Sequence, residues 1–282
     1  MGAPMAANLA RAGHQVTGFD TADVEVQGVR SVGSVEAAVQ DSETVITMLP
    51  DGAVLAAVYA QLVPLMRSGA LLLDCSTVDV DSAAAAHRLA ADAGLLSIDA
   101  PVSGGIGGAT AGTLTFMVGG SEAALERAAP LFDIMGQRHV HCGEGGSGQA
   151  AKICNNLLLG VSMLGTCEAF ALGEKLGLSA ERLFDVISTS SGSCWSVNAY
   201  CPVPGVGPAS PADTDYAPGF AAELMLKDLG LSQRAAEQVD AATPMAARAE
   251  GLYARFVADG GQGKDFSAML PALRAASRGD DR

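Results

Sequence analysis

Positive charge is scarce in this chain. It has 17 Lys and Arg residues against 31 Asp and Glu, which gives a formal net charge of −14 over 282 residues. No basic run occurs in the sequence. Nucleic acids and anionic membrane surfaces are bound by clustered cations that neutralise phosphates. The charge balance therefore argues against both kinds of partner.

Metal-binding and redox motifs are also lacking. The cysteines form no Cys-x-x-Cys pair and have no histidine at metal-ligand spacing; they are Cys75, Cys142, Cys154, Cys167, Cys194 and Cys201. We predict no metal site, and interpret the cysteines as small buried residues in a reducing compartment. The most apolar run, near 157–164, is far short of the roughly 20 residues of a membrane span. Since no signal peptide is evident either, we expect a cytoplasmic protein with no membrane partner.

The first half of the chain alternates strand-like runs with helical patterns. Strands are predicted at 15–19, 29–32, 44–49, 70–74, 95–99, 113–118 and 137–141, and helices at 3–12, 34–40, 52–66, 80–93 and 121–135. This alternation predicts an α/β domain with a largely parallel sheet covered on both faces.

From residue 147 onward, only helices are predicted, at about 148–176, 180–190, 220–240, 243–258 and 265–275. We therefore expect an α/β domain over residues 1–145 and an all-α C-terminal domain over 146–282. The Pro- and Gly-rich segment 201–218 is the one long irregular connection. Long loops inside compact domains are usually functional or disordered, and the sequence leaves the role of this one open.

Part of a nucleotide-binding motif is missing at the start. A Rossmann-type unit has a strand, a Gly-x-Gly-x-x-Gly turn, a helix, a second strand and an acidic residue about 20 positions past the glycines. Gly2, the helix, the second strand and Asp20 are present, but the first strand and first two glycines are not. We expect a doubly wound sheet whose missing central strand leaves its two neighbours unpaired. We also expect that the natural protein starts upstream and that Met1 is an internal methionine.

One lysine stands out in the second half. Gly148, Lys152 and Asn156 are spaced by four and therefore share one face of a helix, with Asn155 beside them. The glycine would leave room for a ligand, the lysine can accept and donate a proton, and the Asn156 amide can orient a hydroxyl. Because a largely apolar stretch follows, we expect Lys152 to be buried. We interpret it as a candidate catalytic residue.

The segment 99–105, Asp-Ala-Pro-Val-Ser-Gly-Gly, follows a predicted strand. The hydroxyl of Ser103 and the backbone N–H groups of Gly104 and Gly105 could converge on an anion, for which a substrate carboxylate is the best candidate. An ordinary Gly-rich turn is the alternative interpretation.

Two more segments end strands at the edge of the sheet where α/β proteins bind ligands. Thr77 could hydrogen-bond a nicotinamide or its ribose, while Leu49 and Pro50 could form an apolar wall; Leu49 could equally pack in the core. Lys227 and Asp228, on a late helix, form a surface ion pair by default, and the role of Asp228 stays open.

Taken together, these motifs resemble the β-hydroxyacid dehydrogenases over essentially the whole chain. Residues 1–5 match the end of the family's glycine motif, 99–105 its substrate-binding segment, 148–156 its catalytic segment and 227–229 its late lysine motif. The resemblance implies an NAD-dependent oxidoreductase with Lys152 as general acid and base, assisted by Asn156. It implies substrate contacts from Ser103, Gly104, Gly105 and Asn155, and NAD contacts from Gly2, Asp20, Leu49, Pro50, Val54, Thr77 and Lys227.

Three further segments, 190–195, 201–206 and 219–220, resemble the branch of this family that oxidises 3-hydroxyisobutyrate to methylmalonate semialdehyde in valine degradation. The alternatives are a tartronate semialdehyde reductase or another dehydrogenase of short hydroxy acids, or a non-catalytic scaffold. A phosphogluconate dehydrogenase is disfavoured, because the chain is short for that group and lacks a basic cluster for a phosphate. The long helix from residue 148 has apolar residues on more than one face, so we expect a homodimer or homotetramer.

Overall fold

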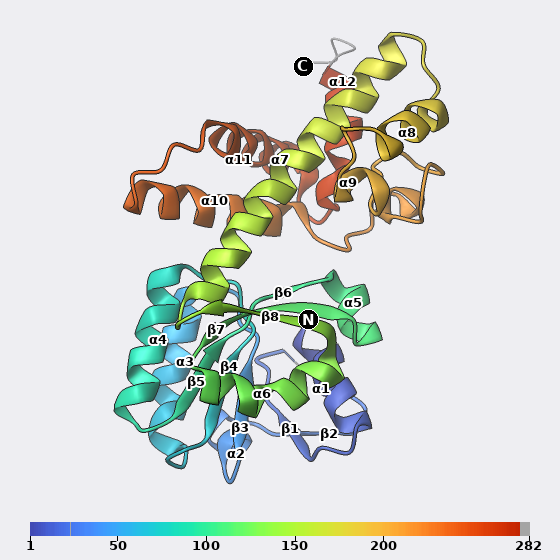
Figure 1. Ribbon diagram of the computed structural model, residues 1–282. Coiled ribbons are helices and arrows are strands. Elements are labelled where there is room, and N and C mark those ends of the chain that lie inside the picture. Colours follow the sequence, from blue (N-terminus) through green and yellow to red (C-terminus); the bar gives the residue numbers. More distant parts are fainter. Residues whose placement is uncertain (23, 277–282) are drawn as a thin grey trace. The chain divides into compact units, whose positions relative to one another are not determined.

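The computed structural model describes residues 1–22 and 24–276, and the chain divides into two compact units, Met1–Lys152 and Ile153–Arg282 (Figure 1). The division falls inside one long helix, α7 (Ser147–Lys175). The first unit is an α/β unit and the second is helical.

The first unit alternates helices and strands. Its elements are α1 (Gly2–Arg11), β1 (Val16–Gly18), β2 (Val29–Ser31), α2 (Val35–Val39), β3 (Thr44–Thr47), α3 (Gly52–Leu62), β4 (Leu71–Asp74), α4 (Val80–Asp92), β5 (Leu96–Asp99), β6 (Val102–Ser103), α5 (Gly105–Ala111), β7 (Leu114–Gly120), α6 (Glu122–Met135) and β8 (Gly136–Gly143). Side-chain caps start several of these helices, because an Asp or Ser oxygen accepts a hydrogen bond from the first turn, as at Asp51 for α3 and Asp79 for α4.

The main sheet has the strand order β3-β4-β5-β7-β6, with β8 pairing to β7. Strands β3, β4 and β5 are parallel, as are β7 and β8, but β7 runs antiparallel to β5 and β6. Most of the strand pairs are thus parallel, as predicted, and the antiparallel pairs are those that β7 makes with β5 and β6. The short strand β6 and helix α5 reverse the chain after β5, so β7 returns beside β5 in the opposite direction.

Strands β1 and β2 form a separate parallel pair. As expected, β1 and β3 are not paired with each other. The pair is held to the rest of the unit by α1 and α2, which contact β1.

The core of the first unit explains why the sheet has helices on both faces. The first three residues of β4 are apolar and buried, and successive side chains of a strand point to opposite faces. Leu71 and Leu73 belong to the same buried cluster as residues of α1 and α6, whereas Leu72 belongs to the cluster with residues of α3 and α4.

The second unit contains the rest of α7 and the helices α8 (Ala180–Thr189), α9 (Trp195–Asn198), α10 (Ala222–Gln238), α11 (Pro244–Phe256) and α12 (Met269–Ala276). By length and composition alone, α7 could cross a membrane, with a mean hydropathy of 1.4 over its most apolar 18 residues. The expectation that the most apolar run is too short to span a membrane was therefore wrong. Within this unit, Met163, Leu164 and Phe170 of α7 belong to the buried core, and a core helix reaches such hydropathy as readily as a membrane span does.

The segment 201–218 is ordered and bonded to its own backbone. The carboxylate of Asp213 accepts hydrogen bonds from the backbone N–H groups of Gly205 and Ser210. Beyond the segment, the buried Asp265 carboxylate accepts from the Tyr200 hydroxyl at 2.8 Å and from the Gly219 and Phe220 N–H groups at 3.0 Å each. Both ends of the loop are thus tied down.

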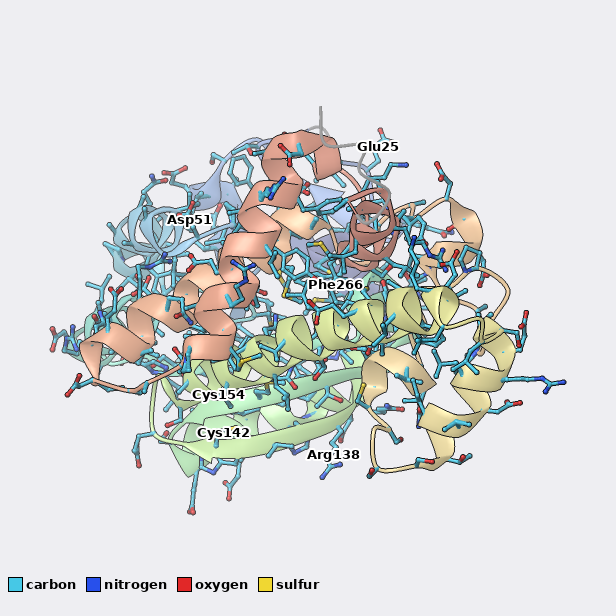
Figure 2. All side chains as sticks on the ribbon, turned by 90° about the horizontal axis from the view of Figure 1, so that it is seen from above. Glu25, Asp51, Arg138, Cys142, Cys154 and Phe266 are labelled. Atoms are coloured by element: carbon cyan, nitrogen blue, oxygen red, sulfur yellow. The ribbon has the colours of Figure 1, made fainter. Side chains whose placement is uncertain are left out.

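All six cysteines are free thiols, but they are not all buried. Cys75, Cys167 and Cys201 are buried, Cys142 and Cys194 are partly exposed, and Cys154 is exposed. Figure 2 labels Cys142 and Cys154, and also Phe266, which lies in the core of the second unit. The interpretation of every cysteine as a buried hydrophobic residue was therefore wrong for half of them.

Candidate active site

Lys152 lies in the second turn of α7 and is only 7% exposed. Its Nζ donates a hydrogen bond to the backbone oxygen of Val102 at 2.8 Å. Val102 belongs to β6 and directly precedes Ser103. The amine is therefore held next to the segment that the sequence predicted to bind a carboxylate, and it is buried as expected.

Gly148 lets α7 approach the sheet closely. A Cβ atom on this residue would lie 2.3 Å from the backbone oxygen of Met117 in β7 and 2.6 Å from that of Asp99 in β5. Both distances are far inside van der Waals contact. The interpretation that Gly148 leaves room for a ligand was therefore wrong, because the strands of the protein itself fill that space.

Asp99 anchors the start of α7. Its Oδ1 accepts a hydrogen bond from the Gly146 N–H at 2.7 Å, and its Oδ2 accepts from the Gln149 N–H at 2.8 Å. These N–H groups would otherwise be unsatisfied at the beginning of a helix. A buried carboxylate thus fixes the turn that precedes Lys152.

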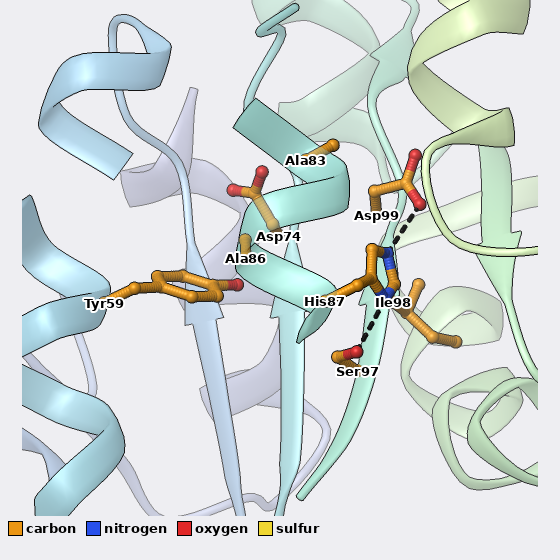
Figure 3. A pocket seen from close by; sticks show the side chains of 8 residues that line it. All are labelled: Tyr59, Asp74, Ala83, Ala86, His87, Ser97, Ile98 and Asp99. Carbon is orange, nitrogen blue, oxygen red and sulfur yellow. Dashed lines mark hydrogen bonds and ion pairs between the residues drawn. The ribbon is translucent and has the colours of Figure 1, made fainter. Parts of the chain in front are cut away.

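Asp99 is also hydrogen-bonded to a chain of two polar side chains, His87 and Ser97 (Figure 3). His87 on α4 lies between Asp99 and Ser97, with Nε2 2.9 Å from Asp99 Oδ1 and Nδ1 2.6 Å from the Ser97 hydroxyl. The three residues have the composition of a hydrolytic triad. However, both carboxylate oxygens of Asp99 also hold α7, so we interpret this chain as an anchor for the helix.

The carboxyl ends of β3 and β4 are joined through Asp74. Its Oδ1 accepts hydrogen bonds from the Thr47 hydroxyl at 2.7 Å and the Ser76 hydroxyl at 2.5 Å. Ser76 Oγ in turn accepts from the Leu49 N–H at 2.8 Å. Burial raises the pKa of Asp74, against the lowering effect of these hydrogen bonds. The loops that carry Leu49 and Thr77 are therefore fixed to each other.

The residues predicted to form an apolar wall differ in burial. Leu49 is partly buried and packs against the core cluster that contains residues of α3 and α4, which agrees with the core-packing alternative. Pro50 is exposed, and Val54 is partly buried in the first turn of α3, where its N–H donates to the capping Asp51 carboxylate at 2.9 Å.

Gln149 connects α7 to the loop that follows β4. Its Nε2 donates to the Ser76 backbone oxygen at 2.8 Å, and its Oε1 accepts from the Val78 N–H at 3.1 Å. The side chain therefore bonds to both residues that flank Thr77. Sequence reasoning missed this residue, although it stands inside the segment 148–156.

The first helix begins at Gly2, one of the predicted cofactor-binding residues. No side chain caps the N-terminus of α1 at Met1, and the N–H groups of such a terminus favour an anion. A Cβ on Gly2 would make only an ordinary 3.5 Å contact with Met48, so contacts within the protein do not require glycine there. Asp20 is exposed just after β1, and one of its oxygens accepts from the Ala22 N–H at 2.9 Å.

The glycine pair after Ser103 forms the start of a helix rather than a simple turn. Ser103 pairs with Thr115 in β7, and α5 begins at Gly105. Gly104 and Gly105 have φ values of 131° and 61°, which favour glycine. These two residues could therefore not be replaced without strain, and Ser103 is held at the end of a paired strand.

In the second unit, Asn156 lies in a second cluster of polar side chains. Its Nδ2 donates to Asp228 Oδ2 at 2.5 Å, and its Oδ1 accepts from Asn155 Nδ2 at 3.0 Å. The Lys227 ammonium lies 3.3 Å from Asp228 Oδ1. Asp228 is only 4% exposed, so the default reading of a surface ion pair was wrong. Its position against Asn156 gives Asp228 a role that the sequence left open.

The predicted residues thus gather in two sets. In the first unit, Lys152 meets the strand that carries Ser103, and Gln149 ties the same helix to the Thr77 loop. In the second unit, Asn155, Asn156, Lys227 and Asp228 are neighbours. Lys152 and Asn156 lie one turn apart on α7. Across residues 1–22 and 24–276, no group of three or more His, Cys, Asp or Glu side chains is arranged to hold a metal ion.

Two family profiles cover most of the chain. The NAD binding domain of 6-phosphogluconate dehydrogenase matches residues 1–143, and the NAD-binding domain of NADP-dependent 3-hydroxyisobutyrate dehydrogenase matches residues 146–273. The two profiles meet just before α7.

Relatives match over nearly their full length. A probable 3-hydroxyisobutyrate dehydrogenase of Mycobacterium tuberculosis is 48% identical over 98% of this chain and 95% of its own length. An NAD-dependent L-serine dehydrogenase of Pseudomonas aeruginosa is 46% identical over 95% of this chain and 93% of its own. A solved structure of M. tuberculosis 3-hydroxyisobutyrate dehydrogenase with L-serine has a TM-score of 0.92 at 48% identity, covering 98% of this chain and 96% of that one.

Both halves of the chain, and the order in which they follow, match one enzyme family. The chain therefore belongs to the β-hydroxyacid dehydrogenases, the family that includes the 3-hydroxyisobutyrate dehydrogenases, and it carries that family's NAD-binding domains.

Proposed function

We propose that this enzyme oxidises the primary alcohol of 3-hydroxyisobutyrate to methylmalonate semialdehyde, with NAD, as a step of valine degradation. The observation that carries the proposal is the 2.8 Å hydrogen bond from Lys152 to Val102, which holds a buried amine next to Ser103. A buried proton carrier beside a carboxylate-binding segment suits an alcohol that carries its own carboxylate.

The substrate is positioned by its acid group. Ser103 and the N–H groups of Gly104 and Gly105 hold the carboxylate, which places the hydroxymethyl carbon at a fixed distance from Lys152. Such fixed geometry lowers the barrier, because the reacting groups need not find each other by diffusion. Lys152 accepts the hydroxyl proton during oxidation and returns it during reduction.

Lys152 acts as a base through its neutral amine, which takes up the proton of the substrate hydroxyl. The NAD nicotinamide, when bound, supplies the acceptor for the hydride that leaves the alcohol carbon. Asn156 follows Lys152 by one helical turn, and Asp228 fixes its amide through the 2.5 Å hydrogen bond. We assign Asn156 the orientation of the substrate hydroxyl or of the lysine.

L-Serine is the second candidate substrate, because one relative is named an L-serine dehydrogenase and a solved relative was determined with L-serine. Both acids carry a hydroxymethyl group next to a carboxylate-bearing carbon. They differ in that 3-hydroxyisobutyrate has a methyl group where serine has an ammonium.

A side-by-side assay of NAD reduction separates the two. We expect kcat/KM to be at least roughly tenfold higher for 3-hydroxyisobutyrate than for L-serine, because a site shaped for a methyl group leaves an ammonium unpaired. Reduction of tartronate semialdehyde, measured in the same buffer, tests the third candidate. A higher kcat/KM for either competitor would reassign the substrate and leave the oxidoreductase class intact.

Asp20 should set the choice of cofactor. A carboxylate in this position accepts hydrogen bonds from the free 2′-hydroxyl of NAD and repels the 2′-phosphate of NADP. We expect the enzyme to prefer NAD, and Asp20→Ser to reduce the ratio of kcat/KM for NAD to that for NADP. Glu25→Gln removes an exposed carboxylate from the same loop and is the control, with an unchanged ratio. Preference of the unaltered enzyme for NADP would refute this role of Asp20.

A further inference from the structure

Gln149 is fully buried in the first turn of α7, and both polar atoms of its side-chain amide form hydrogen bonds. The amide donates to the oxygen of Ser76 and accepts from the N–H of Val78, so it spans the two peptide groups around Thr77. Ser76 and Val78 are themselves buried, whereas Thr77 is partly exposed. The Gln149 side chain therefore holds the loop on both sides of Thr77.

The two partners require a side chain that offers both a donor and an acceptor. The Ser76 oxygen requires a donor and the Val78 N–H requires an acceptor, and glutamine supplies one of each on a single planar group. A carboxylate would leave the Ser76 oxygen facing another acceptor. An apolar side chain would leave both buried backbone groups unpaired, which costs more than the loss of an exposed hydrogen bond.

The backbone of Gln149 is equally fixed. Its N–H is bound by Asp99 at 2.8 Å, and the preceding Gly148 lies against the strands. Lys152 is three residues further along the same helix, where its amine is bound to Val102. The Thr77 loop is thus connected to the catalytic lysine by the Gln149 side chain and one rigid turn of α7.

We propose that Gln149 is a positioning residue that fixes the Thr77 loop relative to Lys152, and so holds the cofactor-binding loop in register with the proton carrier. The proposal rests on the proposed function, in which Thr77 contacts NAD and Lys152 moves the proton. It predicts that loss of Gln149 weakens NAD binding and leaves the binding of the hydroxy acid nearly unchanged.

The test uses the full chain with Gln149→Met, which keeps the side-chain length and removes both hydrogen bonds. NAD binding is measured by calorimetric titration without a hydroxy acid. We expect the dissociation constant to rise about tenfold, as for buried backbone groups left unpaired. We expect KM for the hydroxy acid to change by less than about twofold, since it is bound by other residues. An unchanged NAD affinity in the folded variant would overturn the proposal.

Gln149→Glu is the conservative variant. It keeps the acceptor for Val78 and loses only the donor to Ser76, so its NAD affinity should fall between those of the unaltered enzyme and Gln149→Met. Thr166→Val is the matched control, because it removes a buried hydroxyl from α7 that bonds to the Ser162 oxygen at 2.8 Å. It should lower thermal stability without changing NAD affinity.

Two measurements separate this proposal from the proposed function. Hydrogen exchange of the peptide containing Val78, measured without NAD, should be faster in Gln149→Met; unchanged exchange would contradict the positioning role. The double variant Gln149→Met/Thr77→Val should bind NAD no more weakly than whichever single variant binds it more weakly. Additive losses of NAD affinity would show that Gln149 does not act through Thr77. A chain that binds NAD but does not oxidise 3-hydroxyisobutyrate would contradict only the assigned substrate.

Discussion

Replacing Lys152 by alanine should lower kcat by about 10²–10⁴-fold, the range found when a general acid or base is removed. The amine is the proton carrier of the proposed reaction, and it donates a hydrogen bond to the Val102 oxygen, which β6 presents. NAD affinity should stay nearly the same, because the lysine is assigned to the substrate and not to the cofactor. Steady-state kinetics and calorimetric titration of NAD measure the two quantities separately.

Lys152→Met and Lys175→Ala complete this experiment. Methionine keeps most of the aliphatic stem of the lysine, so a loss of activity in that variant is not due to an empty space in the protein. Lys175 is exposed in the last turn of the same helix, and its replacement should leave kcat unchanged. Equal losses of kcat and NAD affinity on replacing Lys152 would instead identify a structural residue or a cofactor ligand.

Gly148→Ala should be the most damaging single-methyl change in α7. The added Cβ would meet backbone oxygens at 2.3 and 2.6 Å, and backbone atoms cannot move aside as a flexible side chain can. We expect a loss of about 3 kcal/mol in the free energy of unfolding, at the upper end for overpacked sites. Urea denaturation measures this loss, and activity should fall with it because the turn that carries Lys152 would shift.

Gly165 provides the matched control, since it lies on the same helix with nothing within 4 Å of its added Cβ. Gly165→Ala should raise the free energy of unfolding by about 0.5–1 kcal/mol, because alanine is the better helix former. If Gly148→Ala were as stable and active as the unaltered enzyme, the close packing of α7 on the sheet would be incorrect.

Elements with a strong repeating pattern were predictable from sequence. The long helix was predicted at 148–176 and observed at Ser147–Lys175, and the strand at 70–74 was observed at Leu71–Asp74. Helix α5 was missed, since its sequence Gly-Ile-Gly-Gly-Ala-Thr-Ala is rich in a residue that disfavours helices. Tertiary contacts support it, including the hydrogen bond from Asn8 to the Ala109 oxygen at 2.8 Å.

The candidate site was predictable only where its residues share one element. Lys152 and Asn156 could be paired from the helical repeat alone. Gln149 and Asp228 could not be given roles, because their partners lie 71 or more positions away in the sequence. The need for Gly148 was misread for the same reason: the strand oxygens that exclude a side chain there come from β5 and β7.

The ties of segment 201–218 bear on the thermodynamics of ligand binding. A long loop rich in proline and glycine would ordinarily lose much conformational freedom on closing over a ligand. Here Asp213 and Asp265 restrain it through hydrogen bonds within the protein itself. The entropic penalty is therefore incurred during folding, and the segment enters any encounter preorganised.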